Sequence, residues 1–175
     1  MAFTIRNVPS KEALQAFADR FEEADPKAID LTLRLLICSA ELEEMMNMHF
    51  THYELSQTRF SAMMMLFRSP DRTAKPIDMA HHMGMTRGNM TGVLDNLERD
   101  GMVNRQSDDH DRRVHSVHLT DKGYKHLLKM LPEHFSNIRK LIQPLTKTER
   151  ETFVHCIDKI RKGMKEFRSD PEEDI

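Results

Sequence analysis

The stretch MAHHMGMTRGNMTGVLDNLERDGMVNRQSDDHDRRVHSVHLT, residues 79–120, decides how this chain folds. Two short helical patterns stand on either side of Gly84, and their apolar residues recur at the three-to-four spacing of one helix face. Gly84 can adopt the positive φ that ends a helix, and Thr86 can cap the next helix by accepting a backbone N–H. Ala80 is small enough to let the two helices cross closely. The pattern therefore predicts a helix-turn-helix.

The second helix of this motif would present polar side chains opposite its apolar stripe. Arginine can bond O6 and N7 of guanine, asparagine can bond N6 and N7 of adenine, and the methyl group of threonine can touch thymine. We therefore expect this helix to contact DNA through Arg87, Asn89, Thr91 and Asn96. An ordinary surface helix of a helical protein is the alternative, because such motifs also arise by chance.

A hairpin with a basic tip follows the two helices. Residues 102–106 predict one strand and residues 114–119 predict the returning strand, because apolar side chains alternate along them. The segment between the strands carries Arg112 and Arg113. A helix-turn-helix followed by such a hairpin is a winged helix, in which the hairpin reaches the DNA backbone or minor groove beside the second helix.

In these residues the sequence resembles the multiple-antibiotic-resistance regulator (MarR) family of bacterial transcription. The matching positions are Met79, Ala80, Gly84, Met85, Thr86, Thr91, Leu97, Gly101, Met102, Val103, Arg105, Asp111, Arg112, Arg113, Leu119, Thr120 and Gly123. The resemblance implies that Arg113 enters the minor groove at the tip of the wing, held by Asp111. It also implies contacts to the major groove and phosphates from Thr86, Arg87, Asn89 and Thr91. One departure is Gly92, where many members of the family carry arginine.

Composition bounds the class of protein. The chain has 175 residues, 39% of them hydrophobic, which suits one domain with one buried core. Its net charge of −2 means that DNA binding would depend on where the basic residues lie, and that affinity would fall steeply with salt. No apolar run is long enough to span a bilayer, and the opening MAFTIRNVPS lacks the apolar core of a signal peptide. We therefore expect a cytoplasmic protein with no membrane partner.

Further helices are predicted on both sides of the winged helix, so the expected fold class is mainly α with a small β-hairpin wing. A first amphipathic helix should follow the N-cap Ser10, with an apolar face formed by Leu14, Phe17, Ala18 and Phe21. A long helix should run from Pro26 to about His49, and another should follow the cap Ser56. A kinked helix should run from Thr120 through Pro132, and a last helix should follow the capping box of Thr146 and Glu149.

The apolar stripes of these helices are too extensive for the winged-helix lobe to cover. The simplest arrangement is an intertwined homodimer, with residues 1–54 forming dimerisation helices and a ligand cleft. Residues 55–120 would form the DNA-binding lobe, and residues 121–175 the linker and dimerisation helices. A two-fold dimer would place two recognition helices about 34 Å apart and so require a pseudo-palindromic site in double-stranded DNA.

A small-molecule effector is implied by the resemblance alone. In the family, small aromatic or phenolic acids bind between the long first helix, the next helix and the kinked helix, and shift the spacing of the two lobes. Candidate ligand contacts by position are Met45, His49, Phe50, Met63, Met64 and Phe67. Plain core packing is the alternative for each of them. The urate-responsive branch uses a tryptophan in its pocket, and this chain has none, which disfavours that effector.

Metal, cofactor and enzyme chemistry find little support in the residue patterns. Ten histidines are present, but no segment supplies three or four ligands at zinc spacing, so we expect neither a metal site nor a cofactor. Cys38 and Cys156 stand among apolar neighbours and are expected to be buried, with an oxidation sensor at Cys38 as the alternative. No phosphate loop, nucleophile elbow or metalloprotease helix can be placed, so the chain should not be an enzyme.

These patterns favour a homodimeric winged-helix regulator that is released from its operator, as a repressor, by a small lipophilic or aromatic ligand. The alternative from another class is a helical protein–protein adaptor that has the winged-helix shape without reading DNA. The basic wing tip argues against the adaptor, which would have no need for it.

Overall fold

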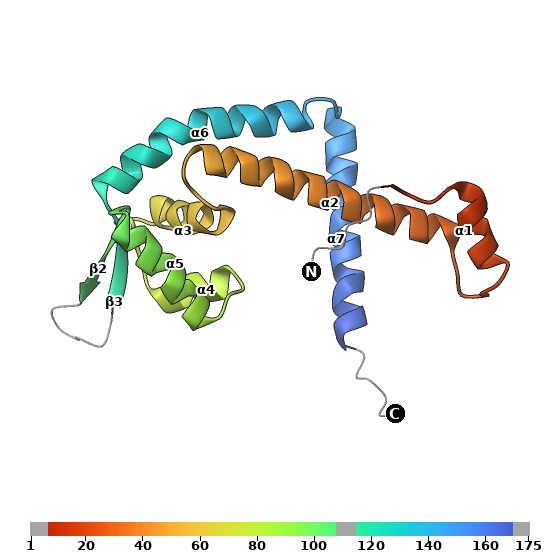
Figure 1. Ribbon diagram of the computed structural model, residues 1–175, viewed down its shortest axis with the longest axis horizontal. Helices are drawn as coiled ribbons and strands as arrows, with labels where there is room; N and C mark the ends of the chain where they lie inside the picture. Colours follow the sequence, from red (N-terminus) through yellow and green to blue (C-terminus); the bar gives the residue numbers. More distant parts are fainter. Residues whose placement is uncertain (1–6, 108–114, 170–175) are drawn as a thin grey trace. The chain divides into compact units, whose positions relative to one another are not determined.

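The computed structural model describes residues 7–107 and 115–169, and this part of the chain holds seven helices and three short strands (Figure 1). The elements are α1 (Lys11–Ala18), α2 (Pro26–His52), α3 (Gln57–Arg68), β1 (Thr73–Ala74), α4 (Pro76–His82), α5 (Arg87–Arg99), β2 (Val103–Ser107), β3 (His115–Leu119), α6 (Asp121–Ile142) and α7 (Lys147–Ser169). The chain divides into two compact units, residues 1–127 and 128–175, with the boundary inside α6.

The core of the first unit lies where α3, α4 and α5 meet the sheet. The strands form an antiparallel sheet in the order β1-β3-β2, and β1 is a two-residue strand that the sequence patterns did not predict. The side chains that fill this core are almost completely buried, namely Leu66, Met79, Met90, Leu94, Leu97, Val103, Val117 and Leu119. The alternation expected of the hairpin is therefore confirmed on its inner face.

The predicted helix starts are confirmed by their capping bonds. Side chains of Ser10, Asp25, Ser56, Thr86 and Thr120 accept first-turn backbone N–H groups at 3.2, 2.8, 3.2, 3.2 and 3.1 Å. Thr146 and Glu149 form the expected capping box, in which the N–H of Thr146 donates to Glu149 at 2.7 Å and the N–H of Glu149 donates back to the Thr146 hydroxyl at 3.3 Å. The bonds from Thr146 hold the pKa of Glu149 below its ordinary value.

Two glycines that end helices adopt the positive φ expected of them, +62° at Gly84 and +71° at Gly101. A third, Gly123, matters for another reason. A Cβ at Gly123 would lie 2.3 Å from the carbonyl oxygen of Met102 and 2.8 Å from a methyl of Leu119. The first turn of α6 therefore packs directly on the backbone that leads into β2, which only glycine permits.

The N-terminal helices differ from their predicted lengths. α1 ends at Ala18, so Phe21 lies beyond the helix, and only Leu14 of the four predicted stripe residues is buried. α2 continues to His52 and ends without a glycine, because Glu54 itself adopts a positive φ of +56°. The N–H groups of Glu54 and Leu55 bond back to the last turn of α2 at 2.9 and 3.0 Å, which closes the helix.

The C-terminal helices span the predicted residues, and the kink at Pro132 stays a prediction. α6 is one continuous helix from Asp121 to Ile142 that contains Pro132, and α7 begins at the capping box. Among the α7 residues whose exposure is described, 147–167, none is buried. Within the described ranges, no helix combines the length and the apolar character that crossing a membrane requires.

Candidate DNA-binding surface

Helix α5 is held by its apolar face and presents the opposite face to solvent. Met90, Leu94 and Leu97 are at most 1% exposed, and α3, α4 and β2 pack against α5. The tight turn at Gly84 brings α4 against α5, which is the helix-turn-helix arrangement predicted from residues 79–97. The polar candidates Thr86, Arg87, Asn89, Thr91 and Asn96 are all exposed.

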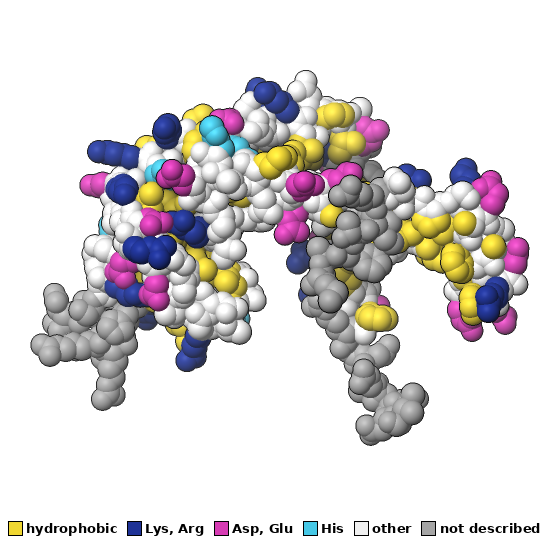
Figure 2. Space-filling model, viewed as in Figure 1, with side chains coloured by type: hydrophobic (Ala, Val, Ile, Leu, Met, Phe, Trp, Pro, Cys, Tyr) yellow, Lys and Arg dark blue, Asp and Glu magenta, His cyan; other side chains and the backbone are white. Residues whose placement is uncertain are grey.

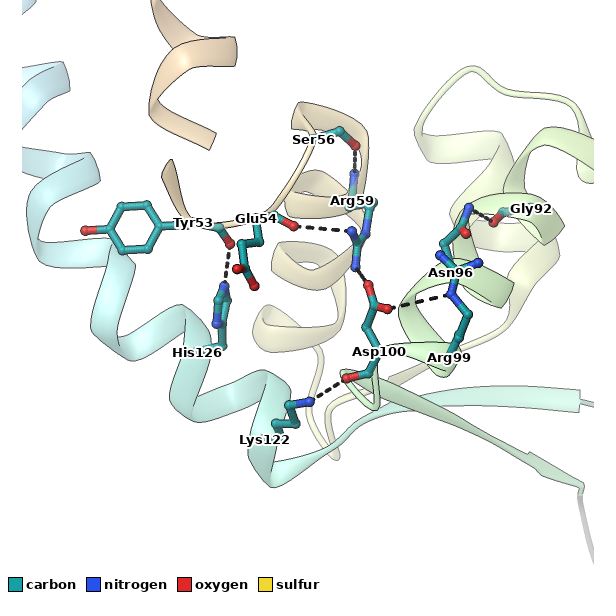
Figure 3. Close-up of polar contacts among 10 residues, drawn as sticks. All are labelled: Tyr53, Glu54, Ser56, Arg59, Gly92, Asn96, Arg99, Asp100, Lys122 and His126. Carbon is teal, nitrogen blue, oxygen red and sulfur yellow. Dashed lines mark hydrogen bonds and ion pairs between the residues drawn. The ribbon is translucent and has the colours of Figure 1, made fainter. Parts of the chain in front are cut away.

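These five side chains differ in how free they are to bind another molecule. The side chains of Arg87 and Asn89 bond no other group within the described part of the chain, so their donors and acceptors face solvent. Thr86 uses its oxygen to cap α5, and Thr91 donates its hydroxyl to the carbonyl of Arg87 at 3.0 Å, so both hydroxyls are already engaged within the helix. Asn96 donates its amide to the carbonyl of Gly92 at 2.8 Å and keeps its side-chain oxygen free (Figure 3). Arg87 and Asn89 are therefore the side chains best prepared for base or phosphate contacts.

Gly92, the departure from the family pattern, lies on this exposed surface. A Cβ at Gly92 would meet nothing within 4 Å. Packing around the Cβ position therefore does not require glycine here.

The wing strand β2 is fastened to α5 by Arg105. Its guanidinium bonds Asp95 at 2.5 Å and Glu98 at 2.9 Å, and its backbone N–H donates to Glu98 at 2.9 Å. The bond to Asp95, followed by the charges of both carboxylates, raises the pKa of Arg105, so the guanidinium is positively charged at any ordinary pH. This pairing compensates two acidic side chains of α5 that would otherwise repel DNA phosphates.

Sequence reasoning matched Arg105 to the family but gave it no role. The signal was present, because Asp95 and Glu98 stand three residues apart on one helix face and the first strand returns along that face. The wing-tip candidates Asp111, Arg112 and Arg113 lie outside the described residues, so their contacts stay a prediction. The strands that lead to the tip pair from Val103 with Leu119 to Ser107 with His115.

The candidate ligand contacts fall into two groups. Phe50 and Met63 are at most 1% exposed, and the ring of Phe50 lies 4.7 Å from that of Phe60 between centroids. Both fit the core-packing alternative. Met45, His49, Met64 and Phe67 are partly exposed. Phe67 stacks on Tyr124 of α6 with a centroid distance of 5.3 Å, so this side chain already joins α3 to α6.

A cavity of about 820 Å³ lies elsewhere, between the starts of α1 and α2. Its walls include Leu14, Pro26 and the ion pair of Asp30 with Arg34. Sequence reasoning did not anticipate this cavity, because it depends on how the short α1 folds back on α2.

The metal and cysteine expectations concern side chains elsewhere on the helices. Across the described ranges, no three His, Cys, Asp or Glu side chains come together in a way that could hold a metal ion. Cys38 and Cys156 are exposed, so the prediction that they are buried is wrong for the single chain. Among their apolar neighbours, Leu36 and Val154 are exposed, whereas Ile37 and Ile157 are only half-buried.

The arrangement of α4, α5 and the hairpin can be compared with known proteins. The sequence model of the MarR family matches residues 55–115, from the start of α3 to the start of β3. Residues 55–115 of this chain are therefore a match to the MarR family. The chain is a transcriptional regulator with a winged-helix fold, and members of the MarR family are DNA-binding transcription factors rather than enzymes.

Two relatives match this chain along nearly its whole length. The chain is 28% identical over 164 residues to the HTH-type transcriptional repressor YetL of Bacillus subtilis (strain 168). The aligned residues cover 94% of this chain and 98% of YetL. It is 26% identical over 162 residues to the transcriptional repressor MprA of Escherichia coli (strain K12), and this alignment covers 93% of the chain and 92% of MprA. The similarity therefore extends beyond the winged helix to the helices on either side.

Solved MarR-family structures have the same fold. Sco3205, a MarR-family transcriptional regulator from Streptomyces coelicolor in complex with DNA, superimposes with a TM-score of 0.68 at 24% identity over 83% of this chain and 93% of that one. A mutant of MarR from E. coli, complexed with operator DNA, gives a TM-score of 0.66 at 18% identity over 77% and 95%. These matches confirm the mainly α fold class with its small antiparallel sheet.

Proposed function

We propose that this MarR-family regulator is a sequence-specific repressor that binds a pseudo-palindromic operator as a homodimer and leaves it when a small aromatic or lipophilic ligand binds. The observation that carries the proposal is the exposed face of α5, where Arg87 and Asn89 are free beside a wing strand whose Arg105 neutralises the acidic residues of the same helix. The relatives named as repressors, and the fold neighbours solved with DNA, support this use of the face. Binding to chromosomal DNA would place the protein in the cytoplasm.

The homodimer is supported by apolar side chains that the single chain leaves in solvent. Figure 2 shows apolar side chains at the surface over α1 and the start of α2. The exposed large residues of the two terminal regions include Phe17, Phe21, Leu31, Leu36, Phe135, Ile138, Phe153, Val154, Met164 and Phe167. A second copy of the chain would cover such surface symmetrically, and it would supply the second recognition helix that a pseudo-palindromic site requires.

Release by an effector requires a ligand that binds the DNA-incompetent state more tightly than the DNA-competent one. The partly exposed candidates Met45, His49, Met64 and Phe67 line the ends of α2 and α3, where a bound aromatic ring could enter between these helices. The buried Phe50 and Met63 would form the floor of such a site. An acidic group on the ligand could pair with His49.

The proposal is tested by titrating the purified protein against DNA from upstream of its own gene, with excess nonspecific competitor and graded salt. We expect a discrete complex with the mass of one dimer per site that survives the competitor. Arg87→Ala and Arg113→Ala should each weaken binding by about 1–3 kcal/mol and lower the salt slope by about one. Lys125→Ala, which removes one charge from the exposed side of α6, is the matched control and should change little.

Two outcomes would count against the proposal. Salt-sensitive smearing without a preferred fragment, repeated across a random DNA library, would contradict operator binding and leave the protein–protein adaptor as the working hypothesis. If specific binding is found, small aromatic acids added to the same assay should dissociate the complex, and failure of every such compound would contradict the effector part alone.

A further inference from the structure

The C-terminal ends of α2 and α5 are joined by side chains rather than by direct packing. The backbone carbonyls of Tyr53 and Glu54 follow the last turn of α2, so they accept no hydrogen bond from within that helix. His126 of α6 donates from Nε2 to the carbonyl of Tyr53 at 3.0 Å, since a carbonyl can only accept. Arg59 of α3 donates from Nη1 to the carbonyl of Glu54 at 3.3 Å.

The same arginine reaches the end of the recognition helix. Arg59 Nη2 bonds the carboxylate of Asp100, the residue that caps the C-terminus of α5. The carbonyl of Asp100 in turn accepts a bond from Lys122 of α6 at 2.7 Å. Lys122 and His126 stand four residues apart on one face of α6, so α6 holds the ends of both helices (Figure 3).

These contacts close a ring that runs from Glu54 through Arg59, Asp100 and Lys122 to His126 and back to α2 at Tyr53. All its members lie within the first compact unit. Arg59 is the member that bridges α2 and α5 directly, and its side chain is only 20% exposed, against 37% for that of Asp100. The pair is therefore shielded from solvent more than an ordinary surface ion pair, which strengthens it.

Electrostatics explains why this bridge needs an arginine. A carboxylate at a helix C-terminus is unfavourable, because the unpaired carbonyls there carry partial negative charge. The cations Arg59 and Lys122 compensate both the carboxylate of Asp100 and the carbonyl ends of α2 and α5. The Nε of Arg59 is buried without a hydrogen-bond partner among the described residues. The position of the side chain therefore favours the two bonds of its terminal nitrogens over a hydrogen bond for every N–H group.

We propose that Arg59 is a positioning residue for DNA binding, which couples the end of α2 to the C-terminus of the recognition helix. The proposal rests on the proposed function, since it concerns how α5 is set for its operator. Glu54 reinforces the coupling, because its positive φ fixes the direction of the carbonyl that Arg59 holds. A movement of α2, by a ligand or by a partner subunit, would thus be transmitted to the angle of α5 most directly through the guanidinium of Arg59.

The experiment measures operator affinity for Arg59→Met, Arg59→Lys, Asp100→Asn and the double variant Arg59→Met with Asp100→Asn. We expect Arg59→Met to weaken binding about tenfold, with a smaller loss for Arg59→Lys, which keeps one of the two bonds. The salt slope should stay at the wild-type value, since no phosphate contact is lost, whereas Arg87→Ala should lower it. Arg68→Met removes an exposed arginine from the other end of α3 and is the matched control.

Asp100→Asn separates positioning from folding. It removes an unfavourable charge from the end of α5 but also leaves Arg59 without its carboxylate partner, so the melting temperature should change little. The loss of a negative charge would by itself favour DNA. Asp100→Asn also releases Arg99 from its 3.8 Å contact with Asp100, which adds a free cation to the end of α5. Weaker binding at an unchanged melting temperature would therefore indicate a looser helix end, since both charge changes favour DNA. The double variant should bind no more weakly than Arg59→Met alone, because the two changes break the same bridge.

Two results would overturn the inference while leaving the proposed function standing. One is wild-type affinity in Arg59→Met or Asp100→Asn, and the other is a reduced salt slope, which would make Arg59 a phosphate contact. If Arg59→Met fails to fold, Arg59→Lys and Asp100→Asn decide the question by the same two criteria. Absence of specific binding by the wild-type protein would instead contradict the proposed function itself.

Discussion

Helices α5 and α7 have the same kind of amphipathic pattern but different surroundings. In α5 the stripe residues Met90, Leu94 and Leu97 are at most 1% exposed. In α7 the exposed stripe includes Phe153 at 51% and Phe167 at 85%. An apolar stripe predicts that a helix face will be covered, but it does not say whether the cover comes from the same chain.

The difference implies that the two regions are stabilised in different ways, one by the chain itself and the other by a partner subunit. The α5 stripe is covered by α3, α4 and β2, so the winged-helix lobe can be stable without help from another chain. The α7 stripe would gain its cover from a partner subunit, and its stability would then depend on protein concentration. Substitutions in the two regions should therefore be distinguishable by measurement.

The largest effect is expected from Leu97→Ala in the lobe. Leu97 is fully buried, and truncation of a buried leucine costs about 2–5 kcal/mol of unfolding free energy. The matched change Phe153→Ala in α7 should leave the unfolding of the lobe nearly unchanged and instead favour monomers. Urea denaturation at several protein concentrations, with sedimentation analysis, measures both. A similar loss of lobe stability from the two variants would contradict the comparison.

A smaller effect is expected from Gly123→Ala, where α6 meets the lobe. The added methyl group would lie 2.3 Å from the Met102 carbonyl, and because that atom belongs to the backbone, relief requires a shift of α6 or β2. Overpacking of this kind costs about 1–3 kcal/mol. The loss should appear in thermal unfolding at every protein concentration, and an unchanged melting temperature would mean that α6 can move away from the backbone before β2 at little cost.

The smallest effect, of opposite sign, is expected from Gly163→Ala in α7. A Cβ at this position meets nothing within 4 Å, and alanine is favoured over glycine inside a helix by about 0.5–1 kcal/mol. The variant should raise helix content slightly and leave operator affinity unchanged, as measured by circular dichroism and DNA titration. If the variant instead lost stability and dissociated to monomers, a partner helix would have to approach closely at Gly163.

The winged helix could be predicted from the sequence in some detail because its signals are local. Thr86, Gly84 and Gly101 act within one or two turns of the chain, and each adopts the role that its chemistry allows. The capping box of Thr146 and Glu149 is a further local signal that the structure confirms. The exposure of the α5 candidates followed from helical periodicity for the same reason.

The parts that escaped prediction depend on residues far apart in the chain. The bridge from Arg59 to Asp100 spans 41 positions, and the bond from His126 to Tyr53 spans 73. The positive φ of Glu54 could not be predicted, because glutamate rarely adopts this conformation and no glycine or asparagine stands at that position. The burial of Cys38 and Cys156 was wrongly predicted, because apolar neighbours in sequence do not establish a cover in space.

By itself, the sequence determined where most helices begin and end, which faces are apolar, and which polar side chains α5 exposes. These properties follow from hydrogen bonds and periodicities within a few residues, which no distant contact needs to complete. Only the tertiary structure decided which stripes the chain covers, how Arg105 neutralises α5, and how Arg59 joins the ends of α2 and α5. Those outcomes depend on the packing of whole elements, because a side chain finds a distant partner only after the helices that carry both have been brought together.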